Sequence, residues 1–333
     1  MQLDRTHVVI RRRTLAEIGD LSLVMLRRYP QALLIGFFLG AFPWAVLNAI
    51  LLWWIPFGEA EFGLTDDEAL AEIWRYLCWM SLLVVLQAPA AGVATTLYLG
   101  QAVFESQPTW GSVFQETKRH FLRWFWALAV VRLAVPAMVL CALRYSLPAQ
   151  AGFDVMVPFL LLISLAIFRS SRPFLPEILL LEQCPLRSSS AAVITARRRS
   201  KSLHQPLASD LGGRFLAISF VLFWLFLSVL YTLLWARGIA LGQWDWDLFF
   251  LLFLFPAALW IIAGVSVVIR LLNYLDTRIR LEGWEVELAV RAEAMRQFGD
   301  EAGLIMMPGT KRSGKAILPG RDTSNANAGG VLP

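Results

Sequence analysis

Residues 215–235, FLAISFVLFWLFLSVLYTLLW, form a run of 21 residues without a single charged side chain. A helix that crosses a bilayer needs about 20 mostly apolar residues. Inside lipid, every backbone polar group must be hydrogen-bonded within the protein, and a helix achieves this within one segment. The run therefore predicts a transmembrane helix.

Five other stretches resemble this run in length and composition. Hydrophobic residues make up 57% of the chain and charged residues only 17%, whereas a soluble domain carries about 25% charge. These features predict an all-α, polytopic membrane helix bundle of about six transmembrane helices, with amphipathic interfacial helices on the cytoplasmic side. The predicted spans are 31–55, 76–104, 121–143, 153–181, 215–236 and 247–272.

The fourth span is the shortest in uninterrupted apolar sequence. VMVPFLLLISLAIF has 14 residues and is followed by RSSRP, which is short for a full crossing. The span either begins earlier, near Ala149, or breaks at Pro173 and continues as a re-entrant or surface segment, FLPEILLLE. Both alternatives are open at this point.

The positive charges predict the orientation of the chain. If the N-terminus is cytoplasmic, 26 of the 30 Lys and Arg residues fall on the cytoplasmic side, and the opposite side holds only Arg75, Arg144 and Arg237. Cytoplasmic loops are enriched in these residues. We therefore expect a multi-pass protein of the bacterial inner (cytoplasmic) membrane with both termini in the cytoplasm.

Signals outside the spans predict four regions. Thr14 and Glu17 form a capping box, in which each side chain bonds the other's backbone N–H at the start of a helix. Past the last span, polar and apolar residues recur at helical spacing, and the tail beyond Asp300 is rich in Gly, Asn, Ser and Ala, which is typical of disorder. The predicted regions are 1–30, a cytoplasmic segment with an interfacial helix; 31–272, the membrane domain; 273–299, a cytoplasmic amphipathic helix; and 300–333, a disordered tail.

Polar residues within the predicted spans are few. Arg132 lies in the third span and either pairs with a carboxylate, packs, or extends outward to the interface. Asn48 and Gln87 favour hydrogen bonds between helices. Small residues at a spacing of four, such as Gly36 and Gly40, indicate helices that approach closely.

Two basic clusters are candidate contacts for a lipid headgroup or another anion. The first, FRSSRPFLPEILLLEQCP, holds Arg169, Arg172 and Glu177, which either bind an anion or pair with each other at the membrane boundary. The second holds Arg197, Arg198 and Arg199, whose charge favours an anionic lipid surface.

The sequence predicts no catalytic residues, no metal site and no cofactor. Its three His residues, His7, His120 and His204, are far apart and lack metal-ligand spacing. No folded basic domain indicates nucleic-acid binding. Cys78 and Cys141 could pair, although two buried thiols are the favoured interpretation.

Three segments carry a resemblance to a known family. They are RRYPQALLIGFFLGAFPWAVLN near the start, FLPEILLLE followed by a basic stretch, and NYLDTRIRLEGWEVELAV near the end. With the pattern YxDxRxRxEGxxxEL over 274–288, the chain resembles bacterial six-span membrane proteins of unknown function, which are similar to the membrane domain of glycerophosphodiester phosphodiesterases. The resemblance covers about residues 14–295 and implies a membrane module without the soluble catalytic domain.

The leading functional hypothesis is a non-catalytic scaffold or accessory subunit. Its partners would be membrane lipids and a protein bound through helix 273–299. That helix holds four Glu and one Arg over 282–293, so we expect it to pack on the basic stretch 197–201 or on the partner. The alternative is a transporter of lipid or a small solute, and a membrane-embedded enzyme ranks third.

Overall fold

The computed structural model describes residues 13–55, 66–104, 108–145, 156–164, 174–187, 194–244 and 247–282. The chain divides into two compact units, 1–285 and 286–333, and every described residue belongs to the first. These residues contain helices and no strand. The prediction of an all-α bundle is confirmed.

Five helical stretches of the described chain are long and apolar enough to cross a membrane: Ala32–Leu52, Leu70–Ala91, Phe121–Leu143, Ala196–Leu241 and Phe250–Glu282. They overlap five of the six predicted spans, as expected for a multi-pass membrane protein. The fourth predicted span has a helix at 156–164, but residues 165–173 lie outside the described residues. The sixth crossing therefore stays a prediction.

The first half of the described chain contains α1 (Leu15–Arg28), the π-helix η2 (Ala32–Phe38), α2 (Leu39–Leu52), α4 (Asp66–Ala91), α5 (Val93–Phe104), α6 (Trp110–Arg119), α7 (Phe121–Trp124), the π-helix η3 (Phe125–Val130) and α8 (Val131–Tyr145). The second half contains α10 (Leu175–Leu180), α11 (Ala196–His204), the 3₁₀-helix η4 (Gln205–Leu207), α12 (Ala208–Leu241), the π-helix η5 (Phe250–Leu254) and α13 (Phe255–Glu282).

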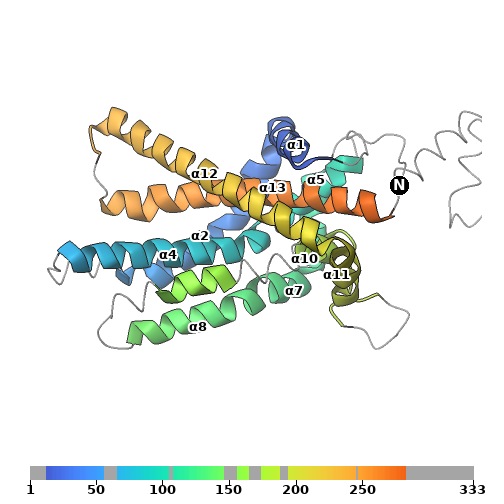
Figure 1. Cartoon of the computed structure of the whole chain (residues 1–333), viewed down its shortest axis with the longest axis horizontal. Helices are drawn as coiled ribbons and strands as arrows, with labels where there is room; N and C mark the ends of the chain where they lie inside the picture. Colours follow the sequence, from blue (N-terminus) through green and yellow to red (C-terminus); the bar gives the residue numbers. More distant parts are fainter. Residues whose placement is uncertain are drawn as a thin grey trace, which may run out of the picture. The chain divides into compact units, whose positions relative to one another are not determined.

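Helix α13 is the central helix of this unit. It contacts α1, α4, α5, α11 and α12 (Figure 1). Helices α12 and α13 run antiparallel, and the left-handed Gly242 ends α12 before the chain returns. Helices α10 and α11 lie together at the end of the bundle where α13 finishes.

Local signals at the N-terminus are confirmed. Thr14 and Glu17 form the predicted capping box of α1, and Ile18, Ser22 and Met25 are buried on one face of that helix. Because the helix ends at Arg28, its last turn carries two arginines, which are favourable near a helix C-terminus.

Prolines mark the irregular turns of the long helices. Each of the three π-helical segments ends two to six residues before a proline: Pro43, Pro136 or Pro256. Proline lacks an N–H and clashes with the preceding turn, and a wider turn relieves that clash. The prolines therefore adjust these helices without ending them.

The predicted second span, 76–104, had wrong bounds. Helix α4 begins ten residues earlier, at Asp66, and ends at Ala91, and α5 follows a turn at Gly92. Pro89 removes a backbone donor close to this break. A Cβ atom at Gly92 would lie 2.7 Å from the Val267 side chain, so the turn is also a point of close packing.

The small residues allow helices to pack closely, as predicted. A Cβ atom at Gly36 would lie 2.9 Å from the Thr95 hydroxyl, and one at Gly40 would lie 2.3 Å from the Ala91 carbonyl oxygen. The second contact is with backbone, which cannot rotate away. Gly40 is therefore required where α2 crosses the end of α4.

We predict that Gly40→Ala lowers the free energy of unfolding by about 1–3 kcal/mol, because the added methyl group overpacks this crossing. Gly19→Ala is the matched control, since no atom lies within 4 Å of its added Cβ. There the gain in helix propensity should raise stability slightly. Thermal unfolding of the two purified variants in detergent measures the difference; equal melting temperatures would contradict the close packing.

Candidate functional site

A cavity of about 650 Å³ lies among α4, α8, α12 and α13. Most of its wall is apolar, and four larger polar side chains, Arg132, Arg214, Arg270 and Asn273, also line it. The apolar lining residues are Val84, Val85, Leu86, Ala88, Leu162, Phe174, Leu175, Leu211, Phe215, Ile218, Leu222, Phe223, Phe226, Leu259, Ile262, Ala263 and Ile269, and Ser81, Ser219 and Ser266 complete the wall.

The polar lining residues gather at one end of the cavity. Arg214 contacts Asn273, which lies one turn from Arg270 on α13. Leu259, on the apolar wall, lies eleven residues before Arg270. At about 1.5 Å of rise per residue, this is roughly 16 Å along the helix. The cavity thus has a cationic end and an apolar end.

Arg270 is held by a buried ion pair. Its Nε atom donates to the Glu177 carboxylate at 2.6 Å, and the two side chains are 8% and 0% exposed. Glu177 is in the first turn of α10, which begins just after Phe174 and has Pro176 near its start. Within the described chain, both Nη atoms of Arg270 and the second oxygen of Glu177 have no hydrogen-bond partner.

Arg214 is held by two carboxylates. Its Nη1 atom donates to Asp276 at 2.8 Å, and its Nε atom lies 3.1 Å from Asp210. Asp276 is buried and also accepts a hydrogen bond from the backbone N–H of Arg13, and Arg280 lies 2.8 Å from it. This carboxylate therefore joins the N-terminal segment, α12 and α13.

Arg132 lines the same cavity but is not paired in this way. It has no hydrogen bond or ion pair with any other described residue, and it lies close enough to Arg270 and Glu177 to interact electrostatically with both. Of the predicted alternatives, pairing with a carboxylate is not formed within the described chain. Arg132 instead brings an unpaired charge to the cavity wall.

Asn48 and Gln87 bond each other, as predicted for packing residues. The Asn48 amide donates to Gln87 at 2.8 Å, and the Gln87 amide donates back at 2.6 Å. Both side chains are fully buried between α2 and α4. Neither lines the cavity, so they form a structural contact between helices.

The basic run of α11 divides between surface and interior. Arg197 and Arg198 are exposed, which agrees with a lipid contact, while Arg199 binds Glu182 at 2.5 Å and also binds Glu282. The contact with Glu282 confirms that the described start of helix 273–299 packs on the basic stretch. Residues 283–299, and the candidate contacts Arg169 and Arg172, lie outside the described residues.

Sequence reasoning missed the long-range partners of the pattern YxDxRxRxEG. The Tyr274 hydroxyl donates to Glu182 at 2.6 Å, Arg278 donates to Glu282 at 2.7 Å, and Arg280 donates to the carbonyl oxygen of Arg13. With Asp276, the polar residues of this pattern fix the end of α13 to surrounding segments. Their spacing indicated a helix and its i,i+4 pairs, but the partners Glu182 and Arg13 are distant in sequence.

The described cysteines are free thiols. Cys78 and Cys141 do not pair, and Cys141 is exposed on the helix surface instead of buried, which corrects that prediction. The described residues contain no group of His, Cys, Asp or Glu that could hold a metal ion. Burial raises the pKa of the Cys184 thiol, and the nearby Glu182 adds to this effect. The thiol is therefore protonated near neutral pH.

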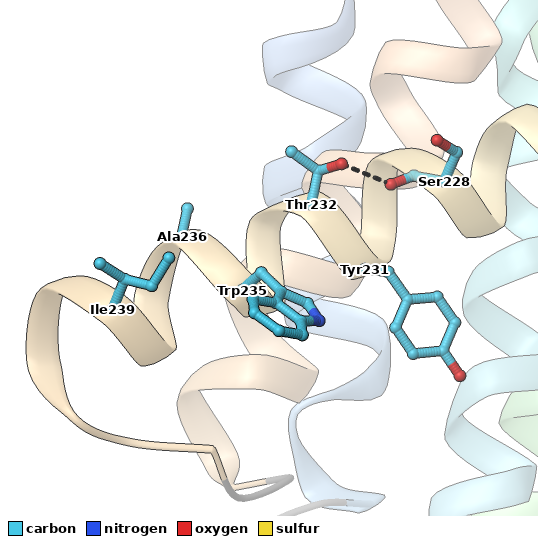
Figure 2. Close-up of a pocket in the computed structure, with 6 residues that line it drawn as sticks. All are labelled: Ser228, Tyr231, Thr232, Trp235, Ala236 and Ile239. Carbon is cyan, nitrogen blue, oxygen red and sulfur yellow. Dashed lines mark hydrogen bonds between the residues drawn. The ribbon is translucent and has the colours of Figure 1, made fainter.

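A second hollow, on α12, is a poorer candidate. Its six lining residues, shown in Figure 2, all belong to that single helix. Tyr231, Trp235 and Ile239 are each more than half exposed, and the Thr232 hydroxyl is already bonded to the Ser228 carbonyl oxygen. One helix cannot enclose a ligand, so this hollow is a surface feature.

No family model, curated protein or solved structure matches the chain. The resemblance to the membrane domain of glycerophosphodiester phosphodiesterases stays a prediction based on sequence pattern. The cavity geometry is therefore the main guide to function.

We predict that Glu177→Gln lowers the free energy of unfolding by about 3–5 kcal/mol, because it leaves the Arg270 charge buried without a counterion. The double variant Glu177→Leu/Arg270→Leu should recover most of the loss, because it removes both charges. Asp210→Asn is the control, since Asp210 is 46% exposed and such pairs contribute at most about 1 kcal/mol. Denaturation in detergent compares the three; a mild effect of Glu177→Gln would show that the pair is not a structural requirement.

Proposed function

We propose that the protein binds an anionic amphiphile of the membrane in this cavity. The observation that carries the proposal is the combination of an extended apolar wall with three arginines at one end. An acyl chain would lie along α12 and α13, and its headgroup would lie near Arg132 and Arg270. Ligand cavities typically enclose about 300–1,000 Å³, and this one falls in that range.

The packing of α12 suggests how such a ligand enters. Among the described helices, α12 packs chiefly on α13 and η5. Leu216, Phe220 and Phe223 on this helix are more than half exposed, and Phe223 also lines the cavity. A lipid chain can therefore reach the cavity sideways past α12 without leaving an apolar environment.

The distribution of positive charge indicates which side of the membrane the cationic end of the cavity faces. Arg214 follows the basic stretch of α11, and Arg270 lies at the end of the last predicted span, 247–272, where a basic region begins. Cytoplasmic segments are enriched in positive charge, so we place the cationic end of the cavity at the cytoplasmic face of the bacterial inner membrane, with both termini on that side. The ligand would then come from the cytoplasmic leaflet.

This function corresponds to the hypothesis of a lipid transporter. We rank it above the hypothesis of a scaffold because a lipid-sized cavity supports it. The scaffold hypothesis depends on a protein partner of helix 273–299, and most of that helix lies outside the described residues. It stays a prediction, as does a membrane-embedded enzyme.

We predict that Ser219→Trp reduces bound phospholipid, because the indole would occupy the cavity from its place on α12. Ser228→Trp is the matched control: Ser228 is also an exposed serine of α12, but it lines the shallow hollow of Figure 2. The measurement is native mass spectrometry of the full chain, released from detergent after equilibration with phospholipid.

The two variants should separate clearly. Ser219→Trp should lose the tightest-bound lipid, and Ser228→Trp should retain it. Equal lipid binding by both variants would contradict the cavity as the binding site. In liposomes, faster movement of labelled lipid between leaflets with the wild type than with Ser219→Trp would show that binding leads to transport.

A further inference from the structure

The arginines of the cavity differ in how completely they are paired. Arg214 lies against two carboxylates, Asp210 and Asp276, and Arg270 lies against Glu177. Arg132 has neither an ion pair nor a hydrogen bond within the described chain. Of the three arginines, Arg132 is therefore the one whose charge a bound anion would neutralise.

The charges of the described residues that line the cationic end or pair with its arginines do not balance. Around the cationic end, the described residues contribute four guanidinium groups and three carboxylates, which leaves one positive charge. Arg280 is the fourth cation, and it shares Asp276 with Arg214. The surplus therefore resides on Arg132, in a helix long and apolar enough to span a membrane.

The one excess positive charge indicates that a fitting ligand carries one negative charge. A guanidinium binds a phosphate or carboxylate through two parallel hydrogen bonds. A phosphate diester brings one negative charge, whereas a monoester brings nearly two at neutral pH. The apolar wall requires hydrocarbon attached to that group.

Resting on the proposed function, we infer that the cavity selects a phospholipid with one net negative charge, whose phosphodiester is bound by Arg132. Arg270 lines the same cavity end, but its Nη atoms have almost no accessible surface and its Nε atom donates to Glu177, so Arg132 is the arginine left to bind the phosphodiester. A zwitterionic phospholipid would leave the surplus charge of the site uncompensated. Headgroup selection thus follows from one unpaired arginine.

Arg132 should affect both the stability of the protein and its lipid preference, and the two effects can be measured separately. In the lipid-free protein, its unpaired charge is costly within a membrane span, so Arg132→Gln should raise the melting temperature. The same substitution should remove the preference for an anionic lipid. A residue with only a packing role would change stability without changing headgroup preference.

The experiment uses the full chain in neutral detergent, titrated with phosphatidylglycerol or phosphatidylcholine of identical acyl chains. For the wild type we expect tighter binding of phosphatidylglycerol, and for Arg132→Gln a roughly ten- to hundredfold loss of that affinity, as for a lost charge-assisted hydrogen bond. Arg132→Lys should retain part of the preference. Apparent dissociation constants come from native mass spectrometry, and melting temperatures are recorded in parallel.

Two controls identify where the anion binds and what it is. Arg119→Gln removes an equal charge from the exposed last turn of α6 and should leave the preference intact. Soluble glycerol phosphate should produce no shift at the lipid concentrations used. If it matched phosphatidylglycerol, the ligand would be a free anion and the inference would be wrong.

The remaining outcomes separate this inference from the proposed function. Equal affinities of the wild type for the two lipids, both lost in Ser219→Trp, would overturn headgroup selection and leave cavity binding intact. Loss of preference in Arg119→Gln equal to that in Arg132→Gln would assign selection to the surface charge of the protein and overturn the role of Arg132. Failure to bind either lipid would overturn both proposals.

Discussion

The ion pair between Glu177 and Arg270 is the interaction on which the candidate site depends. It joins α10, a helix of only six residues, to the central helix α13 across 93 positions of sequence. Two charges buried this deeply are stable only together, because each alone would bear the full cost of lost hydration. The pair thus fixes α10 against α13 and fixes Arg270 at the cavity wall.

Helix α12 owes its position to similar contacts at its two ends. Near its start, Arg214 binds Asp276 of α13, and near its finish, Arg237 binds Asp247 at 2.6 Å. Between these ends, much of the helix surface is exposed, and one side lines the cavity. A helix that is tied at both ends, and packs between them chiefly on one neighbour, leaves room for a ligand beside it. The cavity is a consequence of how α12 is attached.

Local rules predicted the features that depend on neighbouring residues. Apolar length indicated the five long helices, and the Thr14–Glu17 pair indicated the start of α1. The i,i+4 pairs Asp276–Arg280 and Arg278–Glu282 also form as their spacing suggests. Each of these depends on positions within a few turns of one helix, which the sequence displays directly.

Such local rules do not predict contacts between segments that are distant in sequence. The pair of Glu177 with Arg270 was not predicted, because these residues are 93 positions apart in the sequence. Spacing within the helix pairs Asp276 with Arg280, but the bonds of Asp276 to the Arg13 backbone and to Arg214 join segments that are distant in sequence. Helix α6 and the π-helical turns before the prolines were not predicted. Helix α6 is amphipathic but has only ten residues, and a π-helical turn leaves no distinct pattern in the sequence.

The role of Arg132 depends on its neighbours in the folded protein. In the sequence it is one arginine in an apolar helix, and outward extension, packing and pairing with a carboxylate all fit that position. In the structure it lies beside an arginine whose own carboxylate is already occupied. Two like charges with one counterion disfavour the empty cavity, and a bound anion would relieve that repulsion. The feature that weakens the lipid-free protein is therefore the one that would make anion binding favourable, so stability and ligand affinity oppose each other at this position.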